Sequence, residues 1–349
     1  MTATDQRLAT SAAPVRGAVD MTHGAGGRAM ADLIRDVFQK HFNNDYLAQG
    51  NDGALLGKVH GRLVMATDAH VVSPLFFPGG DIGALAVHGT INDVAMMGAR
   101  PLWLSASFIL EEGFSLAALE KIVVSMALAA REAGVPVVTG DTKVVEKGKG
   151  DGVFISTTGI GVLADETDVS GSNARPGNAI IVSGTMGDHG VAILSKREHL
   201  DFETEITSDS QPLHNLVAAM LAAVPGVRVM RDPTRGGLSA TLNEIAQQSK
   251  AGMVIREADV PVKPEVAAAC ELLGLDPLNI ANEGKLVAIC EAADAQVLLA
   301  VMQAHPKGRD AAVIGDVIAD RHALVRMQTR LGGMRVVDWI AGEQLPRIC

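Results

Sequence analysis

Apolar residues recur along the chain with two spacings, one typical of helices and one typical of buried strands. From Met30 they fall at positions i, i+3, i+4, i+7 and i+8, which predicts a helix over residues 28–42. Short runs rich in β-branched residues predict strands instead. The expected strands are 63–66, 102–110, 135–139, 153–162 and 179–182, with others near Val227, Met253, Leu286 and Val313. Because the two patterns alternate, an α/β fold is expected.

Polar residues and glycines mark where helices begin and end. Residues 79–81 open a long expected helix that runs through Met97, and Ser115 caps another over 115–132. Later helices are expected at 189–197, 212–223, 238–248, 265–273 and 292–305. Residues 165–177 lose the apolar period and gather Ser, Gly, Asn and Pro, which favours a boundary between domains at 20–168 and 169–340.

Composition and charge narrow the class of protein. The chain has 349 residues, 48% of them hydrophobic, and a formal net charge of −10, which argues against a nucleic-acid surface or a polybasic membrane patch. Three cysteines are too few for a disulfide framework, and their number is odd. None forms a CxxC pair that could bind zinc. We therefore expect a cytoplasmic protein, with Cys270 and Cys290 in the core. Residues 1–19 lack an apolar segment typical of a signal peptide and are expected to be a disordered extension.

Three carboxylates together suggest a metal site. Asp52 precedes a short apolar run, Asp68 follows the expected strand 63–66, and Asp93 lies inside an apolar helix. A buried carboxylate is costly unless it is paired or bound to a cation, so the set predicts magnesium that holds nucleotide phosphates. Taken singly, residues such as Asp52 and Asp68 are more often turn or cap residues, so only the set points to a metal.

Glycine-rich loops before helices suggest phosphate binding. Residues 23–27 (HGAGG) and 231–237 (RDPTRGG) each lead into an expected helix, whose free amides favour an anion. Lys143 follows an expected strand end, and Glu283 precedes the strand near Leu286, where a carboxylate can act as a base. A flexible turn, a solvated lysine and a surface turn are the alternatives.

The last residues suggest a mobile thiol. Pro346 cannot continue a helix, so residues 341–349 are expected to leave the body as an extended tail that ends in an exposed Cys349. The terminal carboxylate should raise the pKa of this thiol, and Arg347 should partly offset that effect. A prenyl anchor is excluded because the cysteine is not fourth from the end. A frayed terminus is the alternative.

Six segments together resemble one family. They are residues 23–28, 92–99, 140–145, 231–238, 282–285 and the terminal 346–349 (PRIC). From about Asp20 to Cys349 the chain resembles the hydrogenase maturation factors of the AIR synthase (PurM) superfamily, and the terminal PRIC separates these factors from their relatives. The resemblance implies a PurM-like two-domain fold, with N-terminal strands in a β-barrel shared by a homodimer and a C-terminal α/β sandwich.

The resemblance also implies a reaction. HypF would load a carbamoyl group onto Cys349, ATP would drive its dehydration to a thiocyanate, and the HypC–HypD complex would receive the cyanide for [NiFe]-hydrogenase. Lys143 would stabilise charge and Glu283 would take a proton. Implied magnesium ligands are Asp52, Asp68, Asp93 and Asp232. Implied ATP-binding residues are Gly24, Gly26, Gly27, Thr67, Asp68, Asp81, Asn92, Asp93, Gly140, Asp141 and Arg235.

Some positions depart from the family pattern, and other functions compete. Asn51 precedes Asp52 where paired acids are expected, and Ala69 and His70 stand where a small hydroxyl residue is usual. A selenophosphate synthetase or a small-molecule kinase would use the same ATP site, but the synthetase normally has a reactive cysteine near its N-terminus, and this chain has none before Cys270. A non-catalytic assembly scaffold, with the tail as a docking peptide, is a further alternative.

Overall fold

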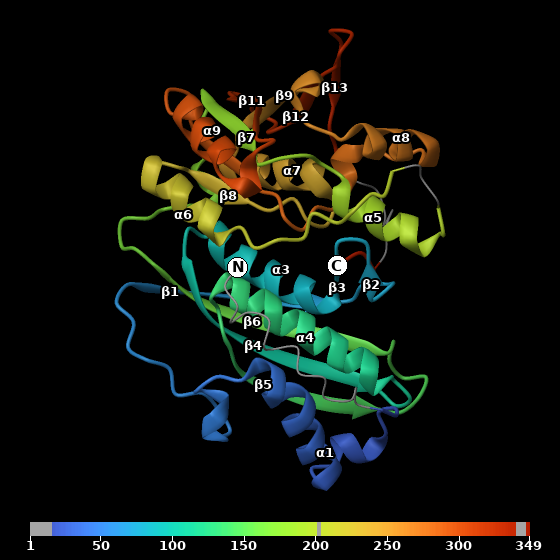
Figure 1. Cartoon of the computed structure of the whole chain (residues 1–349). Coiled ribbons are helices and arrows are strands. Elements are labelled where there is room, and N and C mark those ends of the chain that lie inside the picture. Colours follow the sequence, from blue (N-terminus) through green and yellow to red (C-terminus); the bar gives the residue numbers. More distant parts are fainter. Residues whose placement is uncertain (1–15, 201–203, 340–346) are drawn as a thin grey trace.

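The chain folds around two β-sheets, one from each half of the sequence (Figure 1). The computed structural model describes residues 16–200, 204–339 and 347–349. Most of the expected extension and residues 341–346 of the expected tail therefore lie outside the described residues. The helices are α1 (Arg28–Leu33), α2 (Lys40–Phe42), α3 (Ile82–Met96), α4 (Leu116–Ala133), α5 (Asp188–Arg197), α6 (His214–Ala223), α7 (Gly237–Ser249), α8 (Pro264–Leu273) and α9 (Ala295–Ala304).

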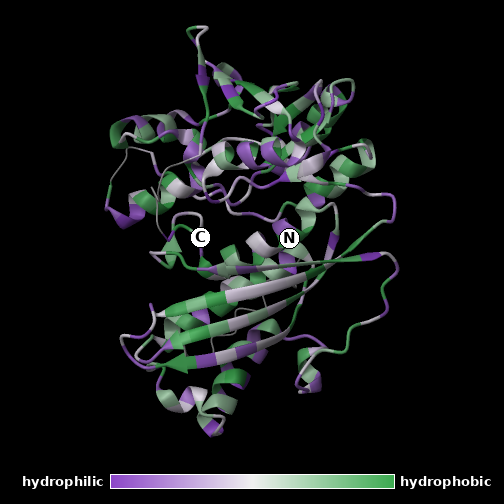
Figure 2. Cartoon of the chain, turned by 180° about the vertical axis from the view of Figure 1, so that it is seen from behind, coloured by the Kyte–Doolittle hydropathy of each residue, from purple (hydrophilic) through white to green (hydrophobic). Residues whose placement is uncertain are grey.

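The first sheet has one covered face and one open face. Its strands run in the order β1 (Arg62–His70), β6 (Val153–Leu163), β4 (Arg100–Glu111) and β5 (Val137–Val145), and only β4 and β5 are parallel. Helices α3 and α4 pack on one face, where Leu104 and Phe108 are buried. The other face carries Met65, which is 70% exposed, and Leu63, which is 65% exposed. Green segments along these strands mark apolar residues (Figure 2).

The second sheet is enclosed on both faces. Its strands are β7 (Asn178–Val182), β8 (Val229–Arg231), β9 (Gly252–Arg256), β10 (Val287–Glu291), β11 (Ala312–Ile318), β12 (Val325–Gln328) and β13 (Met334–Val336). They follow the order β13-β12-β9-β11-β7-β10-β8. Every residue of β7 is buried. One apolar cluster includes Leu242 of α7, and another includes Leu216 of α6 and Leu298 of α9. The C-terminal sandwich is therefore confirmed, as is the core position of Cys270 and Cys290.

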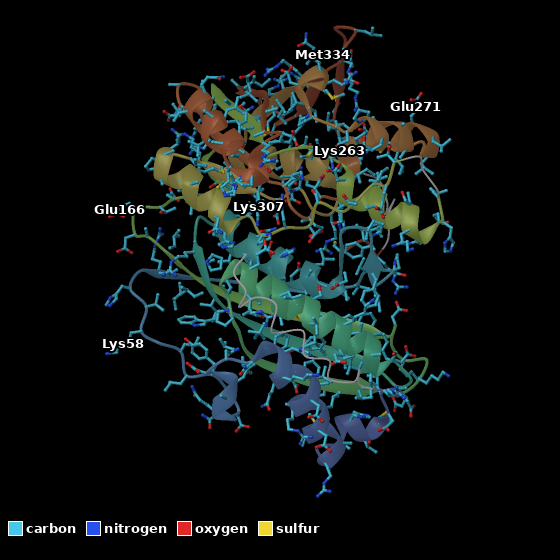
Figure 3. All side chains as sticks on the ribbon, in the orientation of Figure 1. Lys58, Glu166, Lys263, Glu271, Lys307 and Met334 are labelled. Carbon is cyan, nitrogen blue, oxygen red and sulfur yellow. The ribbon has the colours of Figure 1, made fainter. Side chains whose placement is uncertain are left out.

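Two strands are longer than expected, and two hairpins were not expected: β2 (Phe76–Phe77) with β3 (Gly80–Asp81), and β12 with β13. β1 continues to His70, so Thr67 and Asp68 lie within it, because they pair with Thr158 and Thr157 of β6. β5 likewise continues through residues 140–143. Alternating polar residues fit a sheet with one open face, whereas the expectation assumed burial on both. The hairpin β12–β13 was missed because arginines interrupt its short apolar pattern, and Met334 projects from it (Figure 3).

Candidate active site

Four carboxylates from both halves of the chain face one another between the sheets. Asp68 comes from β1 and Asp93 from α3, while Asp232 follows β8 and Glu283 precedes β10. Two of them border Gly89 of α3, since a Cβ built there would lie 3.4 Å from Asp68 Oδ2 and 4.0 Å from Glu283 Oε2. The expected convergence of Asp68, Asp93 and Asp232 is therefore present in the fold.

Burial and mutual repulsion raise the pKa of three of these acids, Asp93, Asp232 and Glu283. Burial, followed by the charges of Asp232 and Asp68, raises the pKa of Asp93 to about 7. Burial also raises the pKa of Asp232 to about 6 and the pKa of Glu283 well above its usual range. Glu283 Oε1 is buried without a hydrogen-bond partner. Such a cluster favours a cation, which would relieve both the repulsion and the unpaired oxygen.

The cation would need oxygens besides those of the protein. Among residues 16–200, 204–339 and 347–349, no three His, Cys, Asp or Glu side chains are arranged as a metal-ligand group. Magnesium commonly keeps several waters and binds through one or two carboxylates and substrate phosphates, so the cluster fits a magnesium nucleotide better than a bare ion.

The raised pKa of Asp93 makes a prediction about stability. Its folded pKa of about 7 exceeds its usual 3.8, so the stabilising contribution is full below pH 4 and is lost as the pH rises through 7. Without divalent cations, we expect the melting temperature to fall between pH 5 and pH 8, and Asp93→Asn to flatten this slope. Differential scanning calorimetry measures it. Asp310→Asn, at an exposed site, should keep the wild-type slope, and an equal slope in Asp93→Asn would contradict the assignment.

The end of the tail is docked between the two halves. Val71 N donates to Cys349 O at 3.0 Å and Ser73 N donates to Arg347 O at 3.1 Å. Ile348 is only 4% exposed and belongs to the core cluster of the first sheet. The expectation of a freely exposed end is therefore wrong for Ile348, which is buried, and for Cys349, which is half-buried, whereas Arg347 is exposed. Sequence reasoning overlooked that Ile348 gains by burial and that the 71–73 backbone offers free donors.

The Cys349 thiol lies against Glu283. The two side chains share a hydrogen bond, and burial, followed by the charge of Glu283, raises the thiol pKa far above its usual range, whereas Arg235 lowers it. Arg347, expected to lower the thiol pKa, instead pairs with Asp151. In this docked position the thiol is therefore protonated at neutral pH.

Several expected nucleotide ligands have structural partners. Asp81 Oδ1 caps α3 by accepting from Gly83 N at 2.7 Å. Asn92 Nδ2 donates to the backbone oxygens of Gln211 and Glu283, and its Oδ1 accepts from Leu213 N at 2.7 Å. Thr67 Oγ1 lies 2.9 Å from Thr158 Oγ1. Asp81 thus caps α3, as expected for the residue that opens this helix, whereas Asn92 fixes α3 against the second half of the chain, which the sequence did not reveal.

Other expected site residues lie apart from the acid cluster. Lys143 Nζ contacts Asp141 Oδ2 at 2.6 Å on β5, and both side chains are more than half exposed. β5 and β1 are the two edges of the first sheet, separated by three strand spacings of about 4.8 Å each. Asp52 is exposed in the loop before β1. One chain therefore brings Cys349, Glu283 and three acids together, but not Lys143 or Asp52.

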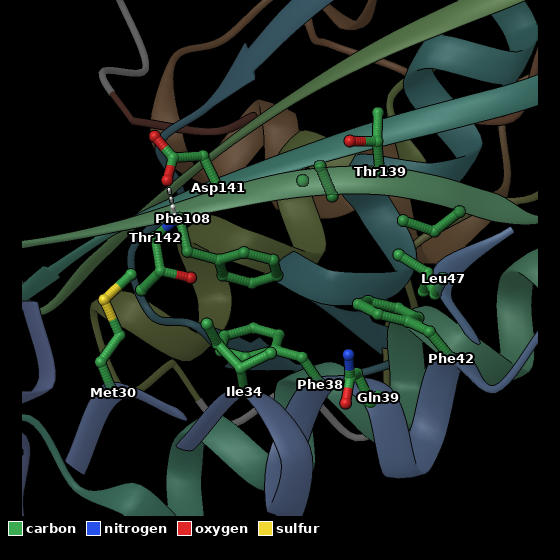
Figure 4. A pocket seen from close by; sticks show the side chains of 13 residues that line it. Met30, Ile34, Phe38, Gln39, Phe42, Leu47, Phe108, Thr139, Asp141 and Thr142 are labelled. Carbon is green, nitrogen blue, oxygen red and sulfur yellow. Dashed lines mark hydrogen bonds between the residues drawn. The ribbon is translucent and has the colours of Figure 1, made fainter. Parts of the chain in front are cut away.

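A second concave site lies beside β5. Gly24 packs so closely on this strand that a Cβ would lie 2.9 Å from Val144 Cβ, while Gly26 and Gly27 have open space around them. Next to this loop, Met30, Ile34, Phe38 and Phe108 line an apolar pocket with Thr139 and Asp141 at its edge (Figure 4). The glycine loop, Gly140 and Asp141 therefore form a separate group from the acid cluster.

Sequence reasoning missed three residues that hold the site together. Asp209 Oδ1 accepts from Glu283 N at 3.0 Å, and both His189 and Arg197 of α5 bind carbonyls of the docked tail. His189 was expected only as the start of a helix. Its place next to a glycine turn was the one available signal, and the partners of all three residues are distant in the sequence.

Comparisons with known proteins identify the family. Residues 50–163 match the AIR synthase related protein, N-terminal domain, and residues 175–328 match the C-terminal domain of the same family. Carbamoyl dehydratase HypE of Cupriavidus necator is 70% identical over 334 residues, 95% of each chain. A crystal structure of the hydrogenase maturation protein HypE in complex with ATP has a TM-score of 0.91 and 52% identity, covering 94% of this chain and 99% of that one.

A HypE chain from a crystal structure of a HypE–HypF complex is also similar. Its TM-score is 0.78 at 49% identity, over 88% of this chain and 99% of that one. These matches cover most of this chain and nearly all of each relative, and they combine high sequence identity with the same fold. The chain thus belongs to the AIR synthase related family and, within it, to the carbamoyl dehydratase HypE family.

Proposed function

We propose that the protein uses ATP to dehydrate a carbamoyl group carried on Cys349 to a thiocyanate. The observation that carries this proposal is the position of the half-buried Cys349 thiol, against Glu283 in a cluster of acids. A carbamoyl group on that sulfur would sit where a base and nucleotide phosphates meet. The same dehydratase activity is named for the relative from Cupriavidus necator.

The chemistry divides one difficult step into two. The carbamoyl oxygen attacks the γ-phosphorus of ATP, ADP leaves, and one nitrogen proton is lost. The carbon–oxygen bond of this phosphate ester then breaks as the second nitrogen proton leaves, which gives the S-bound nitrile and phosphate. Phosphate is a far better leaving group than an oxide, so the activation makes dehydration feasible.

Glu283 is the proposed base for these nitrogen protons. A general base works best when its pKa lies near the working pH, and the raised pKa of Glu283 moves it in that direction. Its contact with the Cys349 thiol places the carboxylate next to the atom that would carry the carbamoyl group. Burial of the site, with Glu283 only 4% exposed, also limits the access of water to the intermediate.

Magnesium ATP is the proposed co-substrate. Bound magnesium would neutralise charge on the transferred phosphoryl group, and Asp68, Asp93 and Asp232 are the residues that would hold it. The apolar pocket beside β5 suits the adenine ring, and the free amides of Gly26 and Gly27 suit phosphate. The relative solved with ATP supports this assignment.

A homodimer would bring the separated groups together. The open face of the first sheet exposes Met65 and Leu63, and a second copy packed there would form a closed barrel. Because β1 and β5 are opposite edges, such packing would let the β5 pocket and Lys143 of one copy approach the acids of the other. The contribution of Asp52 is proposed on the same basis.

The dimer can be tested with one exposed residue. We expect Met65→Asp to weaken dimer formation about 10- to 100-fold, because the new carboxylate would be buried without a partner, and to reduce ATP-dependent turnover in parallel. Sedimentation velocity measures the association. Leu272→Asp, at an exposed site of α8, should leave it unchanged. A dimer of wild-type affinity in Met65→Asp would rule out this face.

The proposed partners follow from the same reaction. HypF would supply the carbamoyl group, which the solved complex of a relative with HypF supports, and the HypC–HypD complex would accept the cyanide. No helix among the described residues is both long enough and apolar enough to cross a membrane. We place the reaction in the cytoplasm because reduced cysteines suit that compartment.

Intact-mass measurement tests the function directly. The full-length protein is incubated with HypF and its carbamoyl donor, and then with magnesium ATP. Cys349 should gain the mass of one carbamoyl group and then lose the mass of one water. A mass that never changes would favour a scaffold, and phosphate transfer to a free metabolite would favour a kinase.

A further inference from the structure

Helix α5 grips the docked tail at two points. His189, in its first turn, has Nε2 2.9 Å from Ile348 O. Arg197, at its end, donates from Nη2 to Arg347 O at 2.8 Å and from Nε to Ser73 O at 2.8 Å. The backbone of residues 71–73 holds the tail from the other side. His189 therefore binds the carbonyl of Ile348, the residue directly before Cys349.

The partners of His189 determine which nitrogen carries the proton. Burial lowers the pKa of His189, so the ring is neutral and has one N–H. Ser210 N donates to Ser208 Oγ at 3.1 Å, which leaves the Ser208 hydroxyl hydrogen to donate to His189 Nδ1 at 2.7 Å. Since the Ile348 carbonyl only accepts, the proton must be on Nε2. Ser208 Oγ thus donates to His189 Nδ1, and His189 Nε2 donates to the Ile348 carbonyl of the tail.

Packing fixes the direction of that N–H. The His189 side chain is fully buried, and its ring meets the Phe77 ring edge-on, with centroids 5.6 Å apart and an interplanar angle of 89°. A ring so enclosed cannot follow the tail if it shifts. Ile348 lies in the same core, so its carbonyl and the neighbouring thiol have one preferred position.

We propose that His189 is a positioning residue: its Nε2–H holds the Ile348 carbonyl so that the Cys349 sulfur, and any group on it, stays against Glu283. The importance of this position for catalysis rests on the proposed function. The docking itself does not, so the two can be tested separately.

Alkylation of Cys349 measures the docking without any turnover. His189→Phe keeps an aromatic ring next to Phe77 but removes the donor, whereas His189→Gln retains an N–H. Intact mass after iodoacetamide treatment of the full-length protein reports on Cys349, because Cys270 and Cys290 are 1% and 0% exposed. We expect His189→Phe to be labelled about tenfold faster than wild type, the equivalent of one lost hydrogen bond, and His189→Gln to fall between.

Turnover then separates positioning from a purely structural role. For protein carrying the carbamoyl group, His189→Phe should lower kcat about tenfold or more and leave the KM for ATP unchanged, and His189→Gln should restore part of the loss. A general loss of folding would move both constants. Wild-type labelling and kcat in a folded His189→Phe variant would overturn the proposal.

Ser208→Ala keeps the test decisive if His189→Phe does not fold. Without the Ser208 hydroxyl, nothing favours the His189 tautomer that carries its proton on Nε2 over the other one. The bond to Ile348 O should weaken, so labelling of Cys349 should rise about two- to threefold. Ser195→Ala is the matched control, because its hydroxyl binds only within α5, to Val191 O at 2.7 Å. Equal labelling of the two serine variants would overturn the proposal. If wild type never forms a thiocyanate but the His189 and Ser208 variants still expose the sulfur, the proposed function fails and the docking role stands.

Discussion

Cys349→Ser should abolish thiocyanate formation and leave ATP binding within a factor of about two. Serine has nearly the shape of cysteine and can keep the backbone bonds of the docked tail, including that from Val71. Its alcohol, however, is a much weaker nucleophile than a thiolate and would not be loaded with a carbamoyl group at a useful rate. We expect product to fall by about a thousandfold or more.

Two measurements check this result. Cyanide released from the protein after loading and addition of ATP gives the turnover, and calorimetric titration with a non-hydrolysable ATP analogue gives the affinity. Cys270→Ser, which changes a core residue, serves as a control for general effects on the fold. Product from Cys349→Ser, or loss of folding in that variant alone, would contradict the carrier role and favour a structural tail.

Glu283→Gln should slow dehydration about 10²- to 10⁴-fold, the usual contribution of a general base. Glutamine keeps the size of the side chain, and the backbone N–H of residue 283 can still donate to Asp209. The carbamoyl group should still be loaded on Cys349, so the loaded form should accumulate when ATP is added. Removing one of several repelling carboxylates should also stabilise the metal-free protein.

Time-resolved intact mass follows this variant. The peak that carries the carbamoyl group should persist, whereas in wild type it should lose one water. Glu271→Gln, on the surface of α8, is the matched control and should behave as wild type. Dehydration at the wild-type rate in Glu283→Gln would show that another group takes the protons.

The fold was largely predictable because its elements follow simple periods. The helix over 28–42, in which a π-helical segment (Ile34–Gln39) joins α1 to α2, and the buried strand 179–182 have patterns that leave few alternatives. The two halves follow from the order of their elements along the chain. The predicted strands that correspond to β1 and β5 end too early, because a sheet with one open face has polar residues inside its strands. The β12–β13 hairpin has too few apolar residues to be recognised.

The site was only partly predictable, for a different physical reason. Asp93 could be identified because a charge in an apolar helix needs a partner. For Asn92 the family resemblance implies nucleotide binding, and its backbone partners lie more than a hundred positions away, where no local pattern indicates them. The docking of Ile348, the grip of His189 and the support that Asp209 gives to Glu283 all depend on the same kind of distant pairing, which no local pattern encodes.

The bonds of Asn92 have a consequence for how the protein works. Helix α3 rests on the first sheet, and this one amide ties it to three backbone groups of the second half. Opening the space between the halves like a hinge would exchange these hydrogen bonds for bonds to water, at a net cost of about 0.5–1.5 kcal/mol each. These bonds resist a hinge between the halves, so we expect that delivery of the Cys349 sulfur under the proposed function would use movement of the chain end and not separation of the two halves.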